Sequence, residues 1–328
     1  MVHSIISAME ALWFDGRQLN LRTGLEVPRP KKGESLVRVR TAGICATDIE
    51  IMRGYMGFIG IPGHEFAGIV TGPDSSPFLG KRVTGEINLP CRKCGYCKKG
   101  LTNHCPKRSV LGILKKNGAF AEFLTLPDKN LHALPGSITD EEAVFIEPLA
   151  AAFEIMEQGA IKKAVRACVL GDGRLGLLVS LTLKLAGANI VTIGRHADKL
   201  KILRTNGIKT VLTDKPVKEK FDVVIDCTGS ADAPAIALSL VRPKGTLVIK
   251  STVAGTRRLD LNKIVIDEIT VIGSRCGPFK PAINAIKDKK MNVTPLIDSV
   301  YSLKDGIKAF KRAGQKGALK VIVHLHTG

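Results

Sequence analysis

Four cysteines stand close together in one short stretch of the chain: Cys91, Cys94, Cys97 and Cys105. Two residues separate Cys91 from Cys94 and Cys94 from Cys97, and seven separate Cys97 from Cys105. The two-residue spacing lets one turn of backbone direct several sulfur atoms to one point. Thiolates in this arrangement are the ligands of a closed, tetrahedral zinc site. A chain of 328 residues in a reducing compartment does not need disulfide bonds. The pattern therefore predicts a structural zinc ion.

The charges around these cysteines are all positive. From position 91 to position 116 the chain has no acidic residue and carries Arg92, Lys93, Lys98, Lys99, Lys107, Arg108, Lys115 and Lys116. Four thiolates around one Zn²⁺ leave a net negative charge, which nearby cations stabilise. A basic cysteine lobe is also typical of nucleic-acid-binding zinc knuckles, so this second interpretation stays open here.

A second set of metal-ligating residue types is dispersed along the chain. Cys45 lies in the segment GICATD, His64 and Glu65 lie in GHEFAG, and Glu147 lies in EPLA. A thiolate, an imidazole and a carboxylate together make a mixed three-ligand zinc site, whose fourth position stays open for water, substrate or Glu65. A site with an open position suits catalysis, because zinc acts as a Lewis acid on the oxygen that enters it.

Residues 171–176, with the sequence GDGRLG, match the dinucleotide-binding pattern G-x-G-x-x-G. They follow an expected strand and open an expected helix, which is the context that the pattern requires. Gly171 permits a tight turn, Gly173 lets the backbone approach a pyrophosphate, and Gly176 allows close packing of helix and strand. The N-terminus of the helix then offers free N–H groups to the anion.

The end of the next strand distinguishes the two nicotinamide cofactors. NAD-binding proteins place a carboxylate there, which hydrogen-bonds the adenosine ribose. This chain has the sequence IGRH at residues 193–196, with no carboxylate and with an arginine that suits a 2′-phosphate. NADP is therefore the expected cofactor, with NAD as the alternative. The residues expected to contact it are Gly171, Gly173, Arg174, Leu175, Gly176, Arg195, His196, Thr228 and Arg275.

Two kinds of segment must position these residues. Residues 9–131 alternate short β-type segments, such as 35–41, 66–71 and 119–126, with glycine and proline, which indicates a β domain. After Glu147, strands alternate with helices, which indicates a parallel sheet covered on both faces. The expected strands there are 168–171, 190–193, 221–227, 246–250 and 269–273, and the expected helices are 149–157, 175–186, 197–206, 233–241 and 281–289. A final strand at 318–324 is expected to return to the first domain.

The composition is that of a folded protein of about two domains. Apolar residues make up 45% of the chain, enough for a packed core. No apolar run reaches the roughly 20 residues that span a bilayer, and the N-terminus lacks the features of a secretory signal. We therefore expect a soluble, cytoplasmic protein with no membrane partner. The net charge of +19 suits nucleic acid, an anionic small molecule or a lysine-rich surface, but aromatic residues are only 5%, which leaves little for base stacking.

The motifs GICATD, GHEFAG, the four-cysteine lobe, EPLA and GDGRLG occur in the order found in zinc-dependent medium-chain dehydrogenases/reductases. The chain resembles this family over nearly its whole length, and the EPLA setting of Glu147 is similar to the sorbitol and threonine dehydrogenase branches. The resemblance implies an α/β protein: a GroES-like β domain in residues 1–147, a Rossmann domain with a doubly wound parallel sheet in residues 148–276, and a return of residues 277–328 to the first domain. It also implies two zinc ions per chain and a homodimer or homotetramer.

The resemblance further implies hydride transfer between an alcohol, including polyols and amino alcohols, and the nicotinamide ring. The alcohol oxygen would bind zinc at Cys45, His64 and Glu147. Catalytic roles are expected for Thr47, Asp48, Glu50 and Glu65.

Three of these residues act on protons or on ligand orientation. Thr47 matches the family's hydroxyl that passes on the alcohol proton, and Asp48 is expected to orient the metal-ligating histidine. Many relatives have histidine three residues after that hydroxyl, whereas this chain has Glu50, which can still accept a proton.

Two other interpretations stay open. A zinc-independent NADP-dependent reductase would keep only the four-cysteine metal. A nucleic-acid-binding protein would use the basic cysteine lobe on a dehydrogenase scaffold, and its binding would fall steeply with salt.

Overall fold

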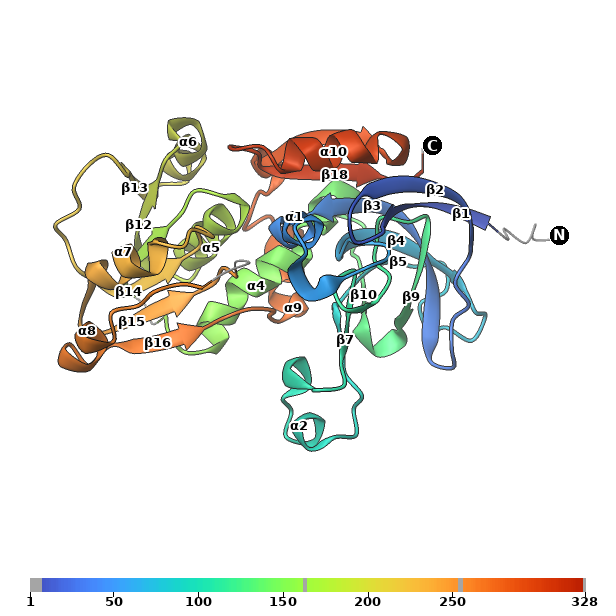
Figure 1. Cartoon of the computed structure of the whole chain (residues 1–328), viewed down its shortest axis with the longest axis horizontal. Coiled ribbons are helices and arrows are strands. Elements are labelled where there is room, and N and C mark those ends of the chain that lie inside the picture. Colours follow the sequence, from blue (N-terminus) through green and yellow to red (C-terminus); the bar gives the residue numbers. More distant parts are fainter. Residues whose placement is uncertain (1–7, 162–163, 253–255, 327–328) are drawn as a thin grey trace. The chain divides into compact units, whose positions relative to one another are not determined.

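The computed structural model describes residues 8–161, 164–252 and 256–326, and the chain divides into two units (Figure 1). The β unit comprises Met1–Glu147 and Leu296–Gly328, and the α/β unit comprises Pro148–Pro295. The first seven residues, which belong to the segment where we expected no secretory signal, lie outside the described part of the chain. Within the described residues, no helix combines the length and the apolar character that crossing a lipid bilayer requires.

The α/β unit is built on a parallel sheet of six strands in the order β13, β12, β11, β14, β15, β16. The strands are β11 (Arg166–Leu170), β12 (Asn189–Gly194), β13 (Lys209–Leu212), β14 (Phe221–Asp226), β15 (Val241–Ile249) and β16 (Thr270–Gly273). The first strand of this unit, β11, lies in the middle of the sheet. The next two strands extend the sheet to one edge, and the last three extend it to the opposite edge, which is the strand order of the Rossmann fold.

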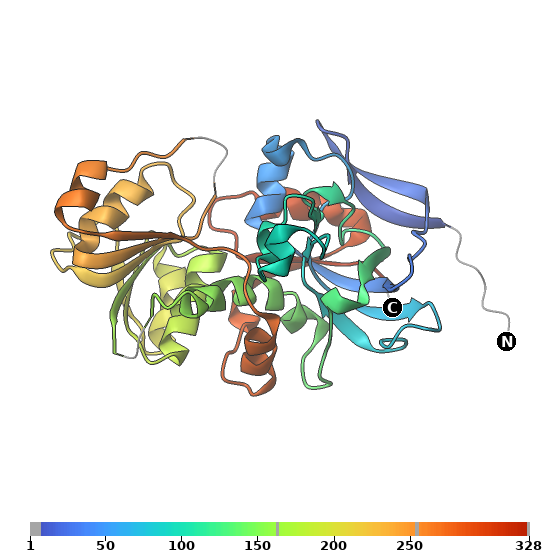
Figure 2. The same cartoon turned by 90° about the horizontal axis from the view of Figure 1, so that it is seen from below.

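Helices cover both faces of this sheet. They are α5 (Arg174–Leu185), α6 (Ala197–Thr205), α7 (Ala233–Leu240) and α8 (Leu261–Ile266). Because parallel crossovers are right-handed, α5 and α6 lie on one face, and α7 and α8 lie on the other (Figure 2). Ala237 and Leu238 of α7 belong to the same buried apolar cluster as Val224 and Leu247 of the central strands. The central strands are therefore apolar along their length, as a sheet buried on both faces requires.

The chain stays in the α/β unit longer than expected. We expected the return to the β domain to begin at residue 277, but the boundary lies between Pro295 and Leu296, so that α9 (Phe279–Lys287) belongs to the α/β unit. The reason is local packing against α4 (Ile146–Glu157): a Cβ on Gly277 would come within 2.1 Å of the Ala150 carbonyl oxygen. The side chains of Phe279 and Ile286 are also buried.

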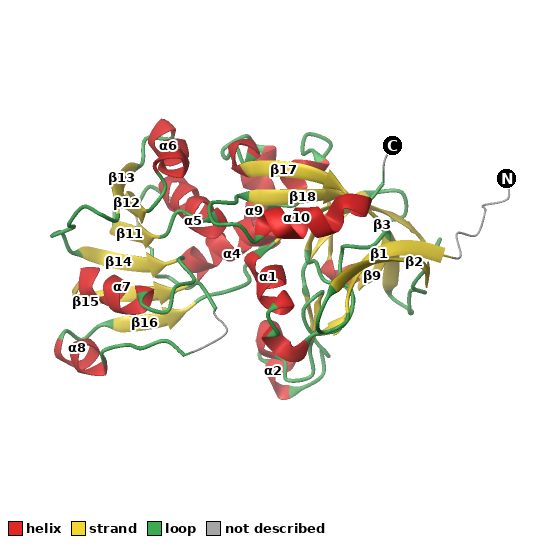
Figure 3. Ribbon diagram, turned by 45° about the horizontal axis from the view of Figure 1, so that its top comes forward, coloured by secondary structure: helices red, strands yellow, loops and turns green. Residues whose placement is uncertain are grey.

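The β unit contains a seven-stranded sheet in the order β10, β5, β4, β3, β18, β17, with β9 also paired to β3. These strands are β3 (Glu34–Ile44), β4 (Glu65–Gly72), β5 (Arg82–Gly85), β9 (Phe123–Pro127), β10 (Leu131–Ala133), β17 (Ile297–Ser302) and β18 (Lys320–His324). The hairpin of β1 (Ala8–Phe14) and β2 (Leu19–Glu26) forms a second sheet, and α10 (Gly306–Ala313) packs on β17 and β18 (Figure 3). The end of β3 is thus paired with β4 on one side and with the last strand of the chain on the other.

The four cysteines lie in a lobe that projects from the sheets of the β unit (Figure 1). The lobe has its own small sheet of β6 (Asn88–Leu89), β7 (Ser109–Leu111) and β8 (Lys115–Lys116), and one short helix, α2 (Gly95–Lys98).

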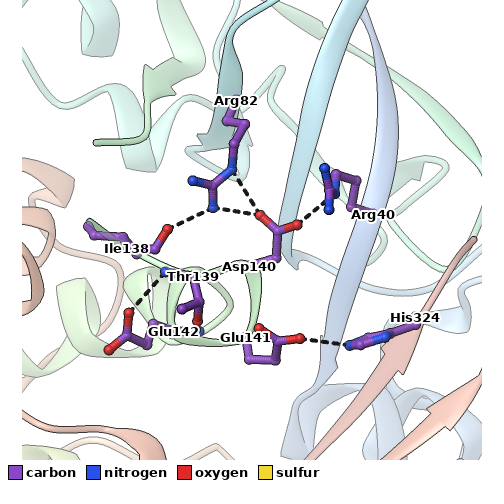
Figure 4. Close-up of polar contacts among 8 residues, drawn as sticks. All are labelled: Arg40, Arg82, Ile138, Thr139, Asp140, Glu141, Glu142 and His324. Carbon is purple, nitrogen blue, oxygen red and sulfur yellow. Dashed lines mark hydrogen bonds and ion pairs between the residues drawn. The ribbon is translucent and has the colours of Figure 1, made fainter. Parts of the chain in front are cut away.

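An ion-pair network attaches α3 (Asp140–Ala143) to the sheet of the β unit (Figure 4). The Asp140 carboxylate is paired with Arg40 of β3 at 2.6 Å and with Arg82 of β5 at 2.6 Å. Arg82 also donates a hydrogen bond of 2.7 Å to the carbonyl oxygen of Ile138. Because α4 begins only three residues after α3 ends, this network also anchors the chain close to Glu147.

Candidate active site

Cys45 and Asp48 lie at the turn between β3 and α1 (Ala46–Met52). The backbone N–H of Cys45 donates to Asp48 Oδ2 at 2.8 Å, which caps the first turn of α1. The other oxygen, Asp48 Oδ1, accepts a hydrogen bond of 3.1 Å from the backbone N–H of Gly63. The Asp48 side chain is fully buried. It therefore ties the turn that carries Cys45 to the segment that carries His64.

His64 and Glu65 lie at the start of β4, opposite the end of β3. In the strand register, Glu65 pairs with Gly43, and both side chains of the His-Glu dipeptide are buried. His64 Nδ1 faces Asp48 Oδ1 across 3.4 Å. Burial alone lowers the pKa of His64, but the Asp48 carboxylate and the Cys45 sulfur outweigh burial and raise this pKa well above its usual value. The imidazole thus faces a site of negative charge.

Three ligand types converge at this point. Three possible ligand atoms lie within 4.8 Å of one another: the Cys45 sulfur, a ring nitrogen of His64 and a carboxylate oxygen of Glu65. Glu65 Oε1 is buried and has no hydrogen-bond partner, which is costly for a polar atom unless something binds it. Sulfur, nitrogen and oxygen donors in one place suit zinc. The residues present therefore fit a metal ion.

Glu147 does not belong to this group. It lies in the first turn of α4 and is half buried. We expected Cys45, His64 and Glu147 to be the three ligands and Glu65 to be a fourth, but the structure brings Glu65 to the first two instead. The strand register explains this: β3 pairing holds Glu65 in place, and the absence of a Cβ on Gly43 leaves room for it, since that Cβ would lie 2.7 Å from Glu65 Oε2.

Lys320 is a site residue that we did not single out in the sequence. Its Nζ is ion-paired with Glu65 Oε2, and both side chains are almost completely buried. The same Nζ lies 5.6 Å from the centre of the Phe145 ring. The available signal was a lysine within the apolar segment ALKVIV, where a strand buried on both faces rarely carries a charge without a partner.

Thr47 and Glu50 follow Cys45 on α1 and are both half buried. Thr47 Oγ1 lies 3.7 Å from the Cys45 sulfur, which places a hydroxyl beside the three converging ligands. Glu50 Oε1 is ion-paired with Arg53 Nη1 at 2.6 Å. The carboxylate at the position where many relatives have histidine is therefore held by the arginine that caps the C-terminus of α1.

The four lobe cysteines form a second group of ligands, with their sulfur atoms within 4.8 Å of one another. The closest pairs are Cys94 with Cys97 at 3.5 Å and Cys94 with Cys105 at 3.7 Å. The backbone N–H groups of Lys93 and Cys94 lower the pKa of Cys91 to about 6. A thiolate is thus favoured near neutral pH before any metal binds, and four sulfurs this close fit one tetrahedral ion.

The glycine-rich turn between β11 and α5 has the geometry of a phosphate cradle. Gly171 has a φ of +118°, and a Cβ on Gly176 would lie 2.1 Å from the Gly171 carbonyl oxygen, so both positions require glycine. Gly173 is the N-cap of α5, has no side-chain cap, and would meet nothing within 4 Å if it carried a Cβ. The N-terminus of α5 is therefore open beside Gly173, which fits a bound pyrophosphate.

The end of β14 carries a second polar cluster. Thr228 donates to Asp226 Oδ1 through its N–H at 2.9 Å and through its hydroxyl at 2.8 Å. Arg257 Nη1 donates to the other oxygen of the buried Asp226 carboxylate at 3.0 Å. Arg257 Nε and Nη2 are buried without a partner, so this guanidinium retains donors for an anionic or carbonyl group. Neither Asp226 nor Arg257 was selected from the sequence.

The other expected nucleotide contacts occupy positions around these strand ends. Arg195 is exposed directly after β12, and Arg275 is exposed after β16. Arg174 and Leu175 are half buried in the first turn of α5. His196, the last of the residues expected to contact the nucleotide, donates its backbone N–H to Asp172 Oδ2 at 2.6 Å.

Two family models match the chain. Residues 31–136 match the alcohol dehydrogenase GroES-like domain, and residues 175–288 match the zinc-binding dehydrogenase domain. Together with the strand order of the α/β unit, these matches confirm a GroES-like domain combined with a Rossmann domain.

Curated relatives and solved structures agree with these matches. Sorbitol dehydrogenase of Halalkalibacterium halodurans is 29% identical over 320 residues, covering 90% of this chain and 93% of that protein. D-altritol 5-dehydrogenase of Agrobacterium fabrum is 32% identical over 283 residues, covering 81% and 84%. A Sinorhizobium meliloti protein assigned as a zinc-binding dehydrogenase and solved with NADP has a TM-score of 0.88 at 28% identity, over 97% of this chain and all of that one. The chain is therefore a nicotinamide-dependent dehydrogenase acting on CH–OH groups, and it belongs to the zinc-dependent medium-chain dehydrogenase/reductase family.

Proposed function

We propose that this protein is a zinc- and NADP-dependent dehydrogenase that transfers a hydride between a polyol or a related secondary alcohol and the nicotinamide ring. The observation that carries the proposal is the convergence of Cys45, His64 and Glu65 within 4.8 Å, with a buried Glu65 Oε1 that lacks a hydrogen-bond partner. The names of the similar proteins, sorbitol dehydrogenase and D-altritol 5-dehydrogenase, support a polyol as the substrate class.

Cys45, His64 and Glu65 would hold the catalytic zinc, with Glu147 as the second carboxylate available to it. A zinc ion in this site supplies Lewis acidity, which favours ionisation of an alcohol. Asp48 fixes the position of the His64 ring and of the Cys45 backbone through its two oxygens. The three donor types and the unpartnered Glu65 Oε1 support this assignment.

Thr47 is the residue placed to accept the alcohol proton, because its hydroxyl lies 3.7 Å from the Cys45 sulfur. Glu50, which is ion-paired with Arg53, would be the next acceptor. A hydroxyl that can both accept and donate a proton suits the start of such a relay.

NADP would bind along the carboxyl ends of the parallel strands, with its pyrophosphate at the start of α5. It supplies the hydride acceptor. Gly171, Gly173 and Gly176 shape the turn for this, and Arg195 supplies a cation for the 2′-phosphate. The four lobe cysteines would hold a second, structural zinc ion.

The experiment combines metal analysis with a substrate panel. Purified protein is expected to contain two zinc ions per chain and to reduce NADP with polyols such as sorbitol, followed at the nicotinamide absorbance. Cys45→Ala should lose one zinc ion and the activity, because one ligand is gone. Cys168→Ala, which removes a buried thiol in β11, should retain two zinc ions and the activity.

Two results would contradict the proposal. One zinc ion per wild-type chain, with activity that survives a chelator, would indicate the zinc-independent reductase. Binding to RNA or DNA with a steep salt dependence, together with no activity on any alcohol, would indicate the nucleic-acid-binding alternative.

We also infer a homo-oligomer. The edge strand β16 is largely exposed, and α8 presents Leu261, Val265 and Ile266 to solvent with 68%, 75% and 78% of their surface accessible. Large apolar side chains this exposed on neighbouring turns mark a contact surface. Light scattering on the wild type should give a dimer or tetramer, and Val265→Asp should shift it toward the monomer; a wild-type monomer would refute the inference.

A further inference from the structure

A carboxylate from the glycine-rich turn reaches the end of the neighbouring strand. Asp172, the second residue of GDGRLG, is only 6% exposed and accepts the His196 backbone N–H at 2.6 Å through Oδ2. The same oxygen lies 3.1 Å from His196 Nδ1. Asp172 is therefore folded against the turn that follows β12 rather than pointing along α5.

The position of this carboxylate is close to that of a side chain on residue 194. A Cβ built on Gly194 would lie 2.6 Å from Asp172 Cβ and 2.6 Å from Asp172 Oδ2. Gly194 is the last residue of β12, the position at which NAD-binding Rossmann proteins carry their ribose-binding acid. The strand end lacks a carboxylate in the sequence, but in space it has one, supplied by a segment 22 residues earlier.

A histidine and an arginine lie at the turn beside this carboxylate. His196, whose side chain is 38% exposed, covers the Asp172 carboxylate on one side, and Arg195 is exposed at the same turn. Arg195 suits a 2′-phosphate, whereas a carboxylate suits the 2′-hydroxyl, which can donate to it. The turn thus holds determinants for both cofactors.

We propose that Asp172 is a specificity-determining residue that limits the preference for NADP, by accepting a hydrogen bond from the ribose 2′-hydroxyl of NAD and by opposing the 2′-phosphate of NADP with its negative charge. The proposal rests on the proposed dehydrogenase function and adds to it that both cofactors bind, with Arg195 favouring one and Asp172 the other. The competing explanation is that Asp172 only tethers the 195–196 turn.

The isosteric substitution Asp172→Asn separates these explanations, because it keeps an oxygen that can accept the His196 N–H and removes only the charge. Binding of NADH and NADPH is measured by nicotinamide fluorescence, without substrate. The Kd for NADH should rise about tenfold, as expected for loss of a charge-assisted hydrogen bond, while the Kd for NADPH should stay the same or fall.

Two matched variants serve as controls. Asp288→Asn removes the same charge at the C-cap of α9, and it should change neither Kd. Arg195→Ala should weaken NADPH binding and leave NADH binding unchanged. The melting temperature of each variant shows that it is folded.

A measurement on the wild type needs no variant to fold. The NADH analogue with 2′-deoxyadenosine should bind about tenfold more weakly than NADH, because the hydroxyl that Asp172 accepts from is absent. Equal losses for NADH and NADPH in Asp172→Asn, or equal binding of NADH and its deoxy analogue, would overturn the proposal. Failure of the wild type to bind either nucleotide would instead refute the proposed function.

Discussion

Lys320, on the last strand of the chain, forms a buried ion pair with Glu65, which lies 255 residues earlier in the sequence. The pair forms because β18 and β4 both flank the end of β3, so that the returning strand brings its lysine to the candidate metal ligand. Glu65 Oε2 is bound by Lys320, whereas Glu65 Oε1 is buried without a hydrogen-bond partner. The C-terminal strand therefore completes the site as well as the sheet.

Lys320→Met should destabilise the β unit strongly. It retains the length of the side chain but leaves the Glu65 carboxylate buried without its cation, which costs about 3 kcal/mol in the free energy of unfolding. Urea unfolding in the presence of a chelator measures this. Zinc should restore part of the loss, because a bound cation would compensate the same carboxylate.

The matched control for this prediction is Lys308→Met. It removes an exposed lysine of α10 that is paired with Asp305. We expect no measurable change in its urea midpoint, since exposed ion pairs contribute little. Equal midpoints for Lys320→Met and the wild type would show that the buried pair does not support the fold.

The cysteine lobe should depend on its metal. With a chelator present, a thiol reagent should modify Cys91, Cys94 and Cys97, which are partly exposed, and zinc should protect them. Cys168 should stay unmodified in both conditions, because it is fully buried and burial raises its pKa to about 12. Mass spectrometry of peptides after timed labelling gives the result for each cysteine. Equal labelling of the lobe with and without zinc would contradict the structural metal site.

Local patterns explain which elements the sequence predicted. The expected strand and helix around the glycine turn correspond to β11 and α5 within two residues, because turn chemistry and apolar periodicity act over short distances. β13 was missed, since Lys209–Leu212 is short and only half buried. The boundary at residue 295 was also missed, because the packing of Gly277 on α4 is not visible in one dimension.

The same distinction applies to the site. The four lobe cysteines are neighbours in sequence, and spacing alone was enough to group them. The Lys320–Glu65 pair depends on the register of two strands with β3, and the approach of Asp172 to Gly194 depends on a parallel crossover. Contacts of this kind follow from tertiary structure, so no local sequence pattern predicts which residues are in contact.

Asp140 should be the most important member of the network in Figure 4. Asp140→Asn removes the charge that pairs with Arg40 and Arg82, and it should lower the free energy of unfolding by about 1 to 3 kcal/mol, because the carboxylate side chain is only 12% exposed. Glu141→Gln is the control: its pair with His324 is more exposed, so the loss should be smaller. Equal losses in the two variants, measured by urea unfolding, would refute this ranking.

Asp222 should make the stability of the α/β unit depend on acidity. Its hydrogen bond from Arg242 Nε, at 2.5 Å, and a second from the Arg166 backbone N–H lower the pKa of this carboxyl in the folded state. A folded-state pKa below the unfolded value gives stability that is present above the unfolded pKa, about 3.9, and that is lost as the pH falls toward the folded value. The urea midpoint of the wild type should therefore drop between pH 7 and pH 3.

Asp222→Asn should lower the midpoint at pH 7 and reduce the drop between pH 7 and pH 3, because a carboxamide does not titrate. Arg242→Met should behave in the same way, since it removes the donor that lowers the pKa of Asp222 and leaves the carboxyl itself in place. The two variants together distinguish this pair from general acid unfolding, which would leave the drop unchanged in both. An unchanged drop would mean that the ionisation of Asp222 does not contribute to the acid sensitivity of the α/β unit.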